Sequence, residues 1–339
     1  MPRGKGTRIA RRTASRGTRP TLRPPGLIVN WLKGDPVETR ANSWLEWSGT
    51  WELDAVYLGA PFDGAGTVRS GSRHAPDAVR SALPGYTTYS TTDGVTMDHL
   101  RAADVGDVVT IVTDMDRTFR HISDATRFLS GRGIRAAIIG GDNSISYPTV
   151  RGLCEGLPGK TIALIQIDAH HDLRESHLGA LSSGVPYRLL LERHPDQVRG
   201  SQMTQIGIAD FCNNPTHHRY AKAHGMAVLS NTEVWRRGIR YAIDVALERA
   251  RKADAIYISI DVDGVDQSSA PGTAAPNPFG LDGRDVIMAV RELAAQRTCA
   301  GLEIVELSPP TDHFGMTANW AAAVVMNFFY GLARQKKTR

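Results

Sequence analysis

The sequence of 339 residues contains only three cysteines and no hydrophobic run long enough to cross a membrane. Cys154, Cys212 and Cys299 lack the short spacing of zinc sites or redox-active pairs, which predicts isolated reduced thiols. A membrane-spanning helix needs about 20 consecutive apolar residues, and the first residues lack the apolar core of a secretory signal. We therefore expect a cytoplasmic protein without a membrane partner.

Acidic residues are absent from the first 25 residues, which carry eight of the 40 lysines and arginines. The remaining 32 basic residues face 35 acidic ones, so the net charge of +5 arises from this segment alone. A segment rich in Arg, Thr, Gly and Pro cannot bury enough apolar surface to fold by itself. We predict a disordered basic extension over 1–25. The rest has no basic stripe with interleaved aromatics, so we expect no nucleic-acid partner.

Polar residues follow three apolar segments that have the composition of buried strands, 135–139, 161–167 and 255–260. Open α/β sheets build their sites at the carboxyl ends of parallel strands. The residues in these positions are Asn143, Asp168, His170, Asp172, Asp261 and Asp263. Four carboxylates would repel one another without a cation between them, and oxygen ligands with one imidazole suit manganese. The pattern therefore predicts a metal site.

The order of these motifs resembles the ureohydrolases, which include arginase, agmatinase, proclavaminate amidinohydrolase, guanidinobutyrase and formimidoylglutamase. The family motifs Gly-Gly-Asp-His-Ser, Asp-Ala-His-x-Asp and Ser-x-Asp-x-Asp-Gly-x-Asp-Pro are similar to 140–144, 168–172 and 259–267. Further similar segments are 59–64, 71–80, 270–273 and 303–309. The resemblance covers 53–335 and implies one ureohydrolase domain. It also implies an arginase-like fold, a three-layer α/β/α sandwich with a mainly parallel eight-stranded sheet, and assembly into trimers or hexamers.

The resemblance implies a role for each polar residue in a site with two manganese ions. Two such ions about 3.5 Å apart lower the pKa of a shared water and supply hydroxide to a guanidinium or formimino carbon. Glu306 would hydrogen-bond the cationic nitrogen of the substrate, and Asp172 would relay a proton to the leaving amine. The implied ligands are Asp168 and Asp261 bridging both ions, His170 and Asp263 on one ion, and Asp172 and Asn143 on the other.

Two positions depart from the family pattern. Asn143 replaces the family histidine, and its amide oxygen is a weaker donor than imidazole, so we expect one ion to bind weakly. His171 could compensate, but adjacent strand residues point to opposite faces, and a histidine hydrogen-bonded to its neighbours is the simpler interpretation. Ser183 stands where arginases and agmatinases have a substrate-contacting histidine, in a loop similar to that of formimidoylglutamase.

Arg174 falls where arginase has a neutral residue that reaches the substrate's α-carboxylate. A guanidinium facing the cleft would bind a carboxylate bidentately. The alternative is a solvent-exposed arginine paired with Glu175 or another acid. The sequence leaves both interpretations open, and the first favours substrates that carry a carboxylate.

Alternating apolar patterns predict a parallel sheet with helices on both faces. The expected strands are 53–59, 135–140, 161–167, 204–208, 226–229, 254–261 and 300–306. The expected helices are 74–82, 115–130, 239–252, 283–296 and 316–334. Four tryptophans, at 31, 44, 47 and 51, predict a Trp-rich amino-terminal cap over 26–52 that packs on the sheet edge or on a neighbouring subunit.

Together these features predict a manganese-dependent, agmatinase-like hydrolase of a linear C–N bond in a small guanidino or formimino compound. It would release urea or formamide and leave a primary amine. The alternative is a family member with a weakened metal site that acts as a regulatory or structural subunit, which the loss of the histidine at Asn143 would favour. Retention of the four aspartates, His170 and Glu306 favours catalysis.

Overall fold

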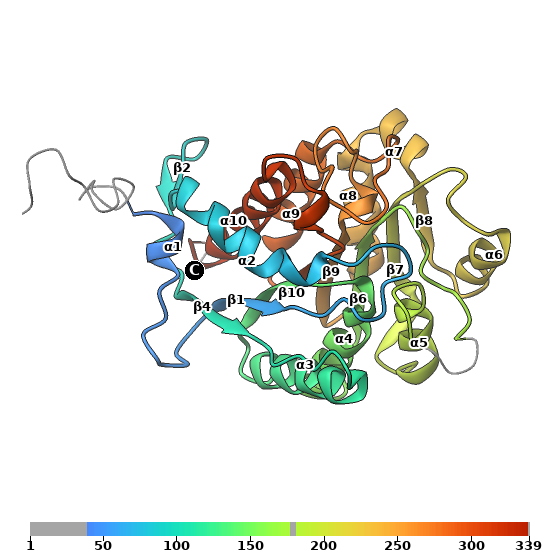
Figure 1. Cartoon of the computed structure of the whole chain (residues 1–339), viewed down its shortest axis with the longest axis horizontal. Coiled ribbons are helices and arrows are strands. Elements are labelled where there is room, and N and C mark those ends of the chain that lie inside the picture. Colours follow the sequence, from blue (N-terminus) through green and yellow to red (C-terminus); the bar gives the residue numbers. More distant parts are fainter. Residues whose placement is uncertain (1–38, 177–180, 338–339) are drawn as a thin grey trace, which may run out of the picture. The chain divides into compact units, whose positions relative to one another are not determined.

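Eight parallel strands form the central sheet of the structure, a computed structural model that describes residues 39–176 and 181–337 (Figure 1). The strand order is β4-β1-β5-β10-β9-β6-β7-β8, and every pairing is parallel. This confirms the predicted eight-stranded sheet. The strands are β1 Ala55–Ala60, β4 Ala102–Asp107, β5 Arg135–Gly140, β6 Ile162–Ile167, β7 Val198–Ile208, β8 Ala227–Ser230, β9 Ala255–Asp261 and β10 Cys299–Val305.

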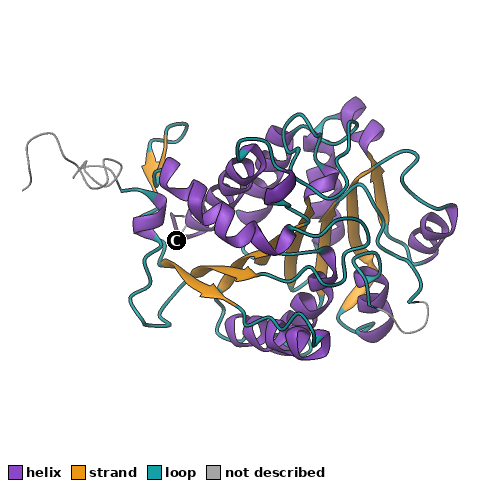
Figure 2. Cartoon of the chain, viewed as in Figure 1, coloured by secondary structure: helices purple, strands orange, loops and turns teal. Residues whose placement is uncertain are grey.

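Helices cover both faces of the sheet and complete three layers (Figure 2). One face carries α2 Ala75–Ala82, α8 Ile239–Ala250, α9 Gly283–Ala294 and α10 Met316–Lys337. The other carries α3 Met115–Ser130, α4 Ser146–Gly156, α5 Pro186–Arg193 and α6 Pro215–Ala223. A parallel sheet covered on both sides needs strands that are apolar on both faces, as the fully buried β1, β6 and β9 are.

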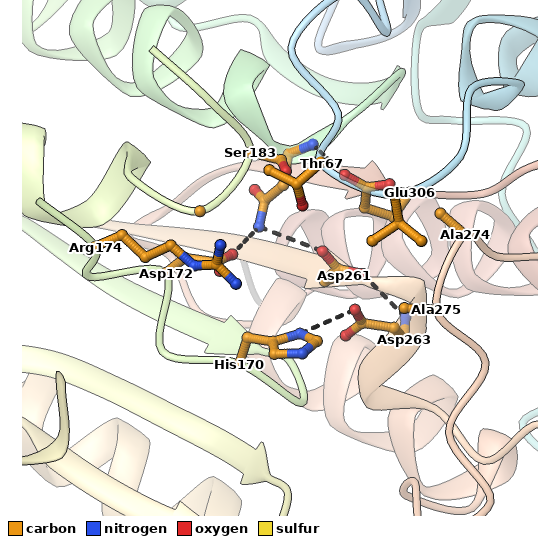
Figure 3. A pocket seen from close by; sticks show the side chains of 13 residues that line it. Thr67, His170, Asp172, Arg174, Ser183, Asp261, Asp263, Ala274, Ala275 and Glu306 are labelled. Atoms are coloured by element: carbon orange, nitrogen blue, oxygen red, sulfur yellow. Dashed lines mark hydrogen bonds and ion pairs between the residues drawn. The ribbon is translucent and has the colours of Figure 1, made fainter. Parts of the chain in front are cut away.

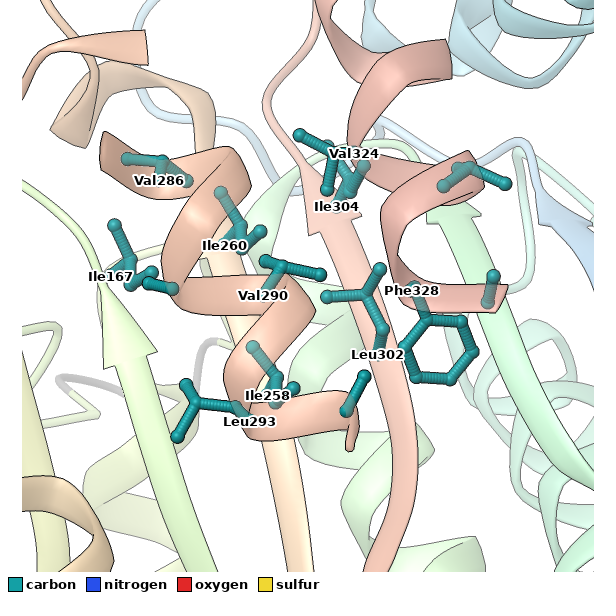
Figure 4. Packing of buried hydrophobic residues seen from close by; sticks show 14 of the residues in the cluster. Ile167, Ile258, Ile260, Val286, Val290, Leu293, Leu302, Ile304, Val324 and Phe328 are labelled. Carbon is teal, nitrogen blue, oxygen red and sulfur yellow. The ribbon is translucent and has the colours of Figure 1, made fainter. Parts of the chain in front are cut away.

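The packing of α9 illustrates how the pattern in the sequence forms this core (Figure 4). Val286, Val290 and Leu293 recur at helical spacing and are fully buried against the strands. Asp282 begins the helix by accepting a hydrogen bond from the Arg284 N–H at 2.8 Å. Each such side chain contributes about 1.5–3 kcal/mol of burial free energy, so the helix is held mainly by its apolar face.

Several elements differ from the prediction. Strand β7 begins six residues before the predicted start, at Val198. Edge strand β4 was missed because its sequence, Ala-Ala-Asp-Val-Gly-Asp, is polar and half-exposed. Helices α4 to α6 and α7 (Asn231–Arg237) were also missed, as was the hairpin β2 (Tyr89–Ser90) and β3 (Val95–Thr96). These elements are short or lie next to site loops, where polar residues obscure the periodicity.

The predicted amino-terminal extension, 1–25, lies outside the described residues, as does 26–38 of the predicted cap. Within the described part, helix α1 (Ala41–Trp44) brings Trp44 edge-on to Phe329 of α10, with 5.6 Å between ring centroids. Trp51 packs in the same way on Phe128 of α3 at 4.9 Å. The Leu45 carbonyl accepts a hydrogen bond from Asp104 N on edge strand β4. These residues therefore pack beside the β4 edge of the sheet.

None of the helices in the described ranges combines the length and apolarity needed to cross a membrane. The sheet order has a direct consequence for function. Strands β5, β10, β9 and β6 are neighbours in the centre of the sheet although they are far apart in the sequence. Their carboxyl ends therefore meet, and the residues that follow them share one region.

Candidate active site

Each of the four central strands delivers polar residues to the same edge of the sheet. The register pairs Ile167 with Ile260 and Val305 with Asp261, so the residues that end β6, β9 and β10 lie at one level. The side chains that line the resulting pocket include Asn143 after β5, His170 and Asp172 after β6, Asp261 at the end of β9, Asp263 just after it, and Glu306 after β10 (Figure 3).

Two groups of these side chains have the geometry to hold a metal ion. In each group the ligand atoms lie within 4.8 Å of one another. Asp168 belongs to both groups, whereas Asp261, the other carboxylate predicted to bridge the ions, belongs to the second group alone. The first group is Asp168, His170 and Asp263, and the second is Asp168, Asp172 and Asp261. The structure thus brings together all five predicted carboxylate and imidazole ligands.

Hydrogen bonds from the protein orient the carboxylates of this cluster. Asp168 is fully buried, and its two oxygens accept from His170 N at 2.6 Å and from Gln166 Nε2 at 2.8 Å. Asp261 accepts from Asp263 N at 2.9 Å. His170 Nδ1 lies 3.0 Å from an Asp263 oxygen, so the two side chains point at each other as two ligands of one cation would. Such partners fix the direction in which ligands point.

Asn143 lies in the cluster as predicted, and its amide nitrogen faces the acids. Its Nδ2 is 2.5 Å from Asp172 Oδ2 and 3.3 Å from Asp261 Oδ2, while its Oδ1 accepts from Ser146 Oγ at 2.6 Å. An amide has nearly the same shape when its oxygen and nitrogen are exchanged. Rotation by 180° therefore presents a carbonyl oxygen to a cation without disturbing the packing.

Burial and mutual repulsion perturb the acids of the pocket. Burial, followed by the charge of Asp263, raises the pKa of Asp172 to about 8. Burial, followed by the charge of Asp142, raises that of Glu306 to about 8. The pKa values of Asp168 and Asp261 are raised well above the ordinary range for the same reasons. A site that disfavours its own ionised carboxylates is one that a divalent cation would stabilise.

The backbone approaches itself closely around these acids. A side chain at Gly141 would collide with the carbonyl of Phe62, and one at Gly264 would collide with the backbone of Asp168. Asp172 and Glu306 adopt left-handed conformations, with φ of 49° and 61°. Such conformations cost on the order of 1 kcal/mol for residues with a side chain. This strain aims both carboxylates into the pocket.

Arg174 and Ser183 also line the pocket. Arg174 is exposed, and its stem lies against Gly184, the residue after Ser183. Glu175, which could have paired with Arg174, instead contacts Arg188 at 3.3 Å. Within the described ranges, the Arg174 guanidinium forms no salt bridge. Ser183 is mostly buried, and its N–H donates to the Ala65 carbonyl at 3.1 Å.

His171 does not take the place of the missing histidine. Its Nδ1 lies 2.6 Å from Gln205 Oε1, and its Nε2 lies 3.4 Å from His218 Nδ1, beside a separate cavity. Burial, followed by the positive charge of neighbouring histidines, lowers its pKa to about 4 despite the Gln205 hydrogen bond. His171 is therefore a buried histidine that is hydrogen-bonded to its neighbours, as the simpler of the two interpretations from the sequence proposed.

Several pocket residues were not found from the sequence. Gln166 orients Asp168, and a buried polar residue inside an apolar strand was the only signal for it. Thr67, Val68, Ala274 and Ala275 line the pocket from two loops and carry no chemical signature. The Asn143 N–H donates to Glu306 Oε1 at 2.8 Å, a contact that joins residues 163 positions apart.

A profile of the arginase family matches residues 53–331 of this chain. A formimidoylglutamase of Halalkalibacterium halodurans is 34% identical over 277 residues, which cover 81% of this chain and 86% of that protein. The crystal structure of the Bacillus subtilis formimidoylglutamase matches with a TM-score of 0.84 at 33% identity and covers 93% of this chain and 97% of that one. A Trypanosoma cruzi formiminoglutamase variant with histidine in place of an asparagine, solved with Mn²⁺, has a TM-score of 0.80. At 23% identity, with 87% and 98% covered, this last likeness shows the fold alone.

The chain therefore belongs to the arginase family. The ureohydrolase resemblance, the α/β/α fold and the class of enzyme, a hydrolase acting on a C–N bond of a linear amidine, are confirmed. The donor set of carboxylate oxygens with one imidazole fits the manganese chemistry of the sequence prediction. The agmatinase-like part of that prediction is not what these similarities favour, because the relatives compared above are formimidoylglutamases.

Removal of metal should make stability depend steeply on pH. The pKa values of Asp172 and Glu306, about 8, exceed those of unfolded carboxyl groups, near 4. Their contribution to stability is then fully present below about pH 4 and is lost as the pH rises through 8. We expect the free energy of unfolding of chelated protein to fall across this range, while manganese-loaded protein changes less. Urea unfolding at pH 5 to 8, with chelator or with Mn²⁺, measures the difference in the free energy of unfolding between the two forms. Parallel pH profiles would contradict this prediction.

Proposed function

We propose that this chain is a manganese-dependent hydrolase of a formimino group on a carboxylate-bearing substrate, in the manner of a formimidoylglutamase. Formimino-glutamate is the favoured substrate, and a guanidino acid is the second choice. The products would be formamide, or urea in the second case, and a primary amine. The observation that carries this proposal is the exposed Arg174 guanidinium at the mouth of the acidic pocket, without a salt bridge in the described ranges.

The protein groups divide into those that hold metal and those that handle substrate. The proposed ligands are Asn143, Asp168, His170, Asp172, Asp261 and Asp263. When bound, two manganese ions supply a water of lowered pKa. Manganese is supported by the donor set, carboxylate oxygens with one imidazole, which suits this ion. By resemblance to the family, we also retain the prediction of a trimer or hexamer.

Glu306 and Asp172 would carry the proton chemistry and orientation of the reacting group. Glu306 is held by the Asn143 N–H through one oxygen, which leaves the other free for a cationic amidine nitrogen. Asp172 lines the same pocket and, by resemblance to the family, would be the acid–base group beside the attacking water. It would take a proton from the attacking water and return it to the departing amine.

The shape of the pocket favours a substrate with a carboxylate tail. The cavity around the cluster, ≈ 90 Å³ in volume, is lined by Asp172, Arg174 and Glu306 among others. A second cavity of ≈ 270 Å³ shares His170, Asp172 and Arg174 and continues to Asn214 and His217. A tail leaving the metal cluster therefore passes Arg174. A carboxylate there would gain a charge-assisted pair, whereas the amine of agmatine would be repelled.

The proposal is tested by a substrate panel on the full chain loaded with Mn²⁺. Formimino-glutamate, guanidinobutyrate, arginine and agmatine are compared by release of formamide, urea and ammonia. We expect formimino-glutamate to give the highest kcat/KM and agmatine the lowest. A highest kcat/KM for agmatine would overturn the carboxylate interpretation.

Arg174→Ala should raise KM for the preferred acid by roughly one to two orders of magnitude. The loss corresponds to the roughly 1.5–3 kcal/mol of a charge-assisted hydrogen bond. Agmatine turnover should be unchanged or improved, because a like charge near its amine is removed. Arg188→Ala is the matched control, since Arg188 is engaged by Glu175 and Glu192. Equal effects of the two substitutions, or no effect of Arg174→Ala, would show that Arg174 is an ordinary surface residue that does not bind the substrate.

Asn143→His should make metal binding tighter at the weaker position. An imidazole nitrogen is a stronger donor than an amide oxygen for manganese, so the variant should keep two ions through dialysis while the wild type loses part of one. Elemental analysis after dialysis gives the stoichiometry. Two ions per wild-type chain that resist chelation would show that Asn143 does not weaken metal binding.

The alternative function, a regulatory or structural subunit with a weakened metal site, rests on one observation. The Asn143 amide places a nitrogen, rather than a ligand atom, toward the carboxylates. This alternative predicts no hydrolysis of any panel substrate at saturating Mn²⁺, and activity that appears with Asn143→His. The pocket argues against it, because its buried acids and Arg174 are retained in positions suited to catalysis.

A further inference from the structure

A buried carboxyl group beneath the pocket has no part in the function proposed above. Glu303 lies inside strand β10 and is fully buried. Its oxygens accept from Ser259 Oγ at 2.7 Å and from Tyr257 Oη at 3.1 Å, and Ser146 hydrogen-bonds to it as well. A buried acid is costly unless it is fully hydrogen-bonded. The hydroxyl groups gathered around this one carboxyl group therefore form a built arrangement.

Ser146 connects this carboxyl group to the metal cluster. It is fully buried at the start of α4, and its Oγ lies 2.6 Å from Asn143 Oδ1. A serine hydroxyl has one hydrogen to donate and can accept through its oxygen. The Asn143 amide oxygen and Glu303 therefore compete as acceptors for the same hydrogen. Burial raises the pKa of Glu303, whereas the hydroxyl groups that donate to it favour its ionised form. An ionised carboxylate is a stronger acceptor than an amide oxygen, so the hydrogen is assigned to the Glu303 side.

This assignment has a consequence for Asn143. If the Ser146 hydroxyl donates to Glu303, the Ser146 oxygen can only accept a hydrogen bond from Asn143. The donor must then be the NH₂ of the Asn143 amide. The amide oxygen then points in the opposite direction, toward Asp168, Asp172 and Asp261. We propose that Glu303, acting through Ser146, is a positioning residue that turns the carbonyl oxygen of Asn143 toward the metal cluster.

The proposal rests on the proposed metal-binding role of Asn143 and explains how a neutral amide serves there. A free amide among carboxylates would present its NH₂ to them and exclude a cation. With its NH₂ held by Ser146, the amide presents a ligand atom before metal arrives. Substitution of groups that orient a metal ligand typically lowers metal affinity by about 10–100-fold.

The test measures Mn²⁺ binding to the metal-stripped full chain by calorimetry, together with metal content by elemental analysis. Glu303→Gln keeps the shape of the side chain but offers only one accepting oxygen to the surrounding hydroxyls. Ser146→Ala removes the connection itself. Each should weaken binding of one manganese ion by roughly 10–100-fold. If Ser146→Ala does not fold, as judged by circular dichroism, Glu303→Gln carries the test.

The control background is Asn143→Asp, because a carboxylate has two equivalent oxygens and needs no orientation. In that background, the same substitutions should change manganese affinity by less than about threefold, within the spread of unrelated surface changes. Equal losses in both backgrounds would show that Glu303 and Ser146 are only structural, and unchanged affinity in the wild-type background would also overturn the proposal. Failure of the proposed function looks different, since wild type and Asn143→Asp would then both bind no manganese or leave every panel substrate intact.

Discussion

Asp168→Asn is expected to lose both manganese ions and to retain at most about one thousandth of the wild-type kcat/KM. Asp168 belongs to both groups of potential ligands and is fully buried between them. A neutral amide there leaves two cations repelling each other with less negative charge between them. Without metal the water keeps its ordinary pKa, and most of the acceleration of at least about 10⁶-fold typical of enzymes is lost.

Elemental analysis and kcat/KM are measured on the same preparations of Asp168→Asn, Asp261→Asn and Asp263→Asn. Asp261→Asn should resemble Asp168→Asn, whereas Asp263→Asn should mainly affect the ion on the His170 side. Asp210→Asn, in a neighbouring cavity, is the control and should change neither quantity. Normal metal content in Asp168→Asn or Asp261→Asn would show that the ligand assignment is wrong.

Glu306→Gln is expected to lower kcat/KM by roughly 30- to 5,000-fold while metal content stays at the wild-type value. The estimate follows from the 2–5 kcal/mol typical of removing one partner from a buried, hydrogen-bonded charge pair, at about 1.4 kcal/mol per tenfold. Glutamine keeps an oxygen for the Asn143 N–H, so the local fold should persist. The charge that would attract the amidinium is removed.

The diagnostic comparison is between substrate and metal readouts for Glu306→Gln. A residue that touches substrate alters kcat/KM without altering manganese affinity, whereas a ligand alters both. Glu155→Gln, a half-exposed acid on α4, is a control for the loss of one negative charge. A kcat/KM within about threefold of wild type would remove Glu306 from the substrate contacts.

The sequence was sufficient to predict that the candidate ligands come together, because each of them is local to a strand end. Asp168 to Asp172 and Asp261 to Asp263 directly follow buried strands, and parallel strands bring such ends together. The helix over 115–130 could be predicted equally well, because Asp114 caps its start and apolar residues recur at helical spacing. In these places, local pattern and tertiary position agree.

What the sequence could not show are contacts between residues that are distant in the chain and ordinary in composition. Ser146 and Glu303 meet beneath the pocket, yet neither belongs to a motif that predicts the other. Glu175 forms its ion pair with Arg188 and not with its neighbour Arg174. The sequence does not show which arginine Glu175 contacts, because packing determines it. Strand β4 was missed because an edge strand needs little apolar sequence.

The central strand order also determines when this protein can acquire its metal. The proposed ligands Asn143 and Asp261 lie 118 positions apart, and closing so long a segment of chain is entropically costly before the sheet centre exists. No partly synthesised or partly folded form holds the complete ligand set. On the proposed ligand set, metal uptake would therefore be a late event on a finished scaffold. Bound ions should slow unfolding rather than speed folding, because they stabilise contacts absent from the folding transition state.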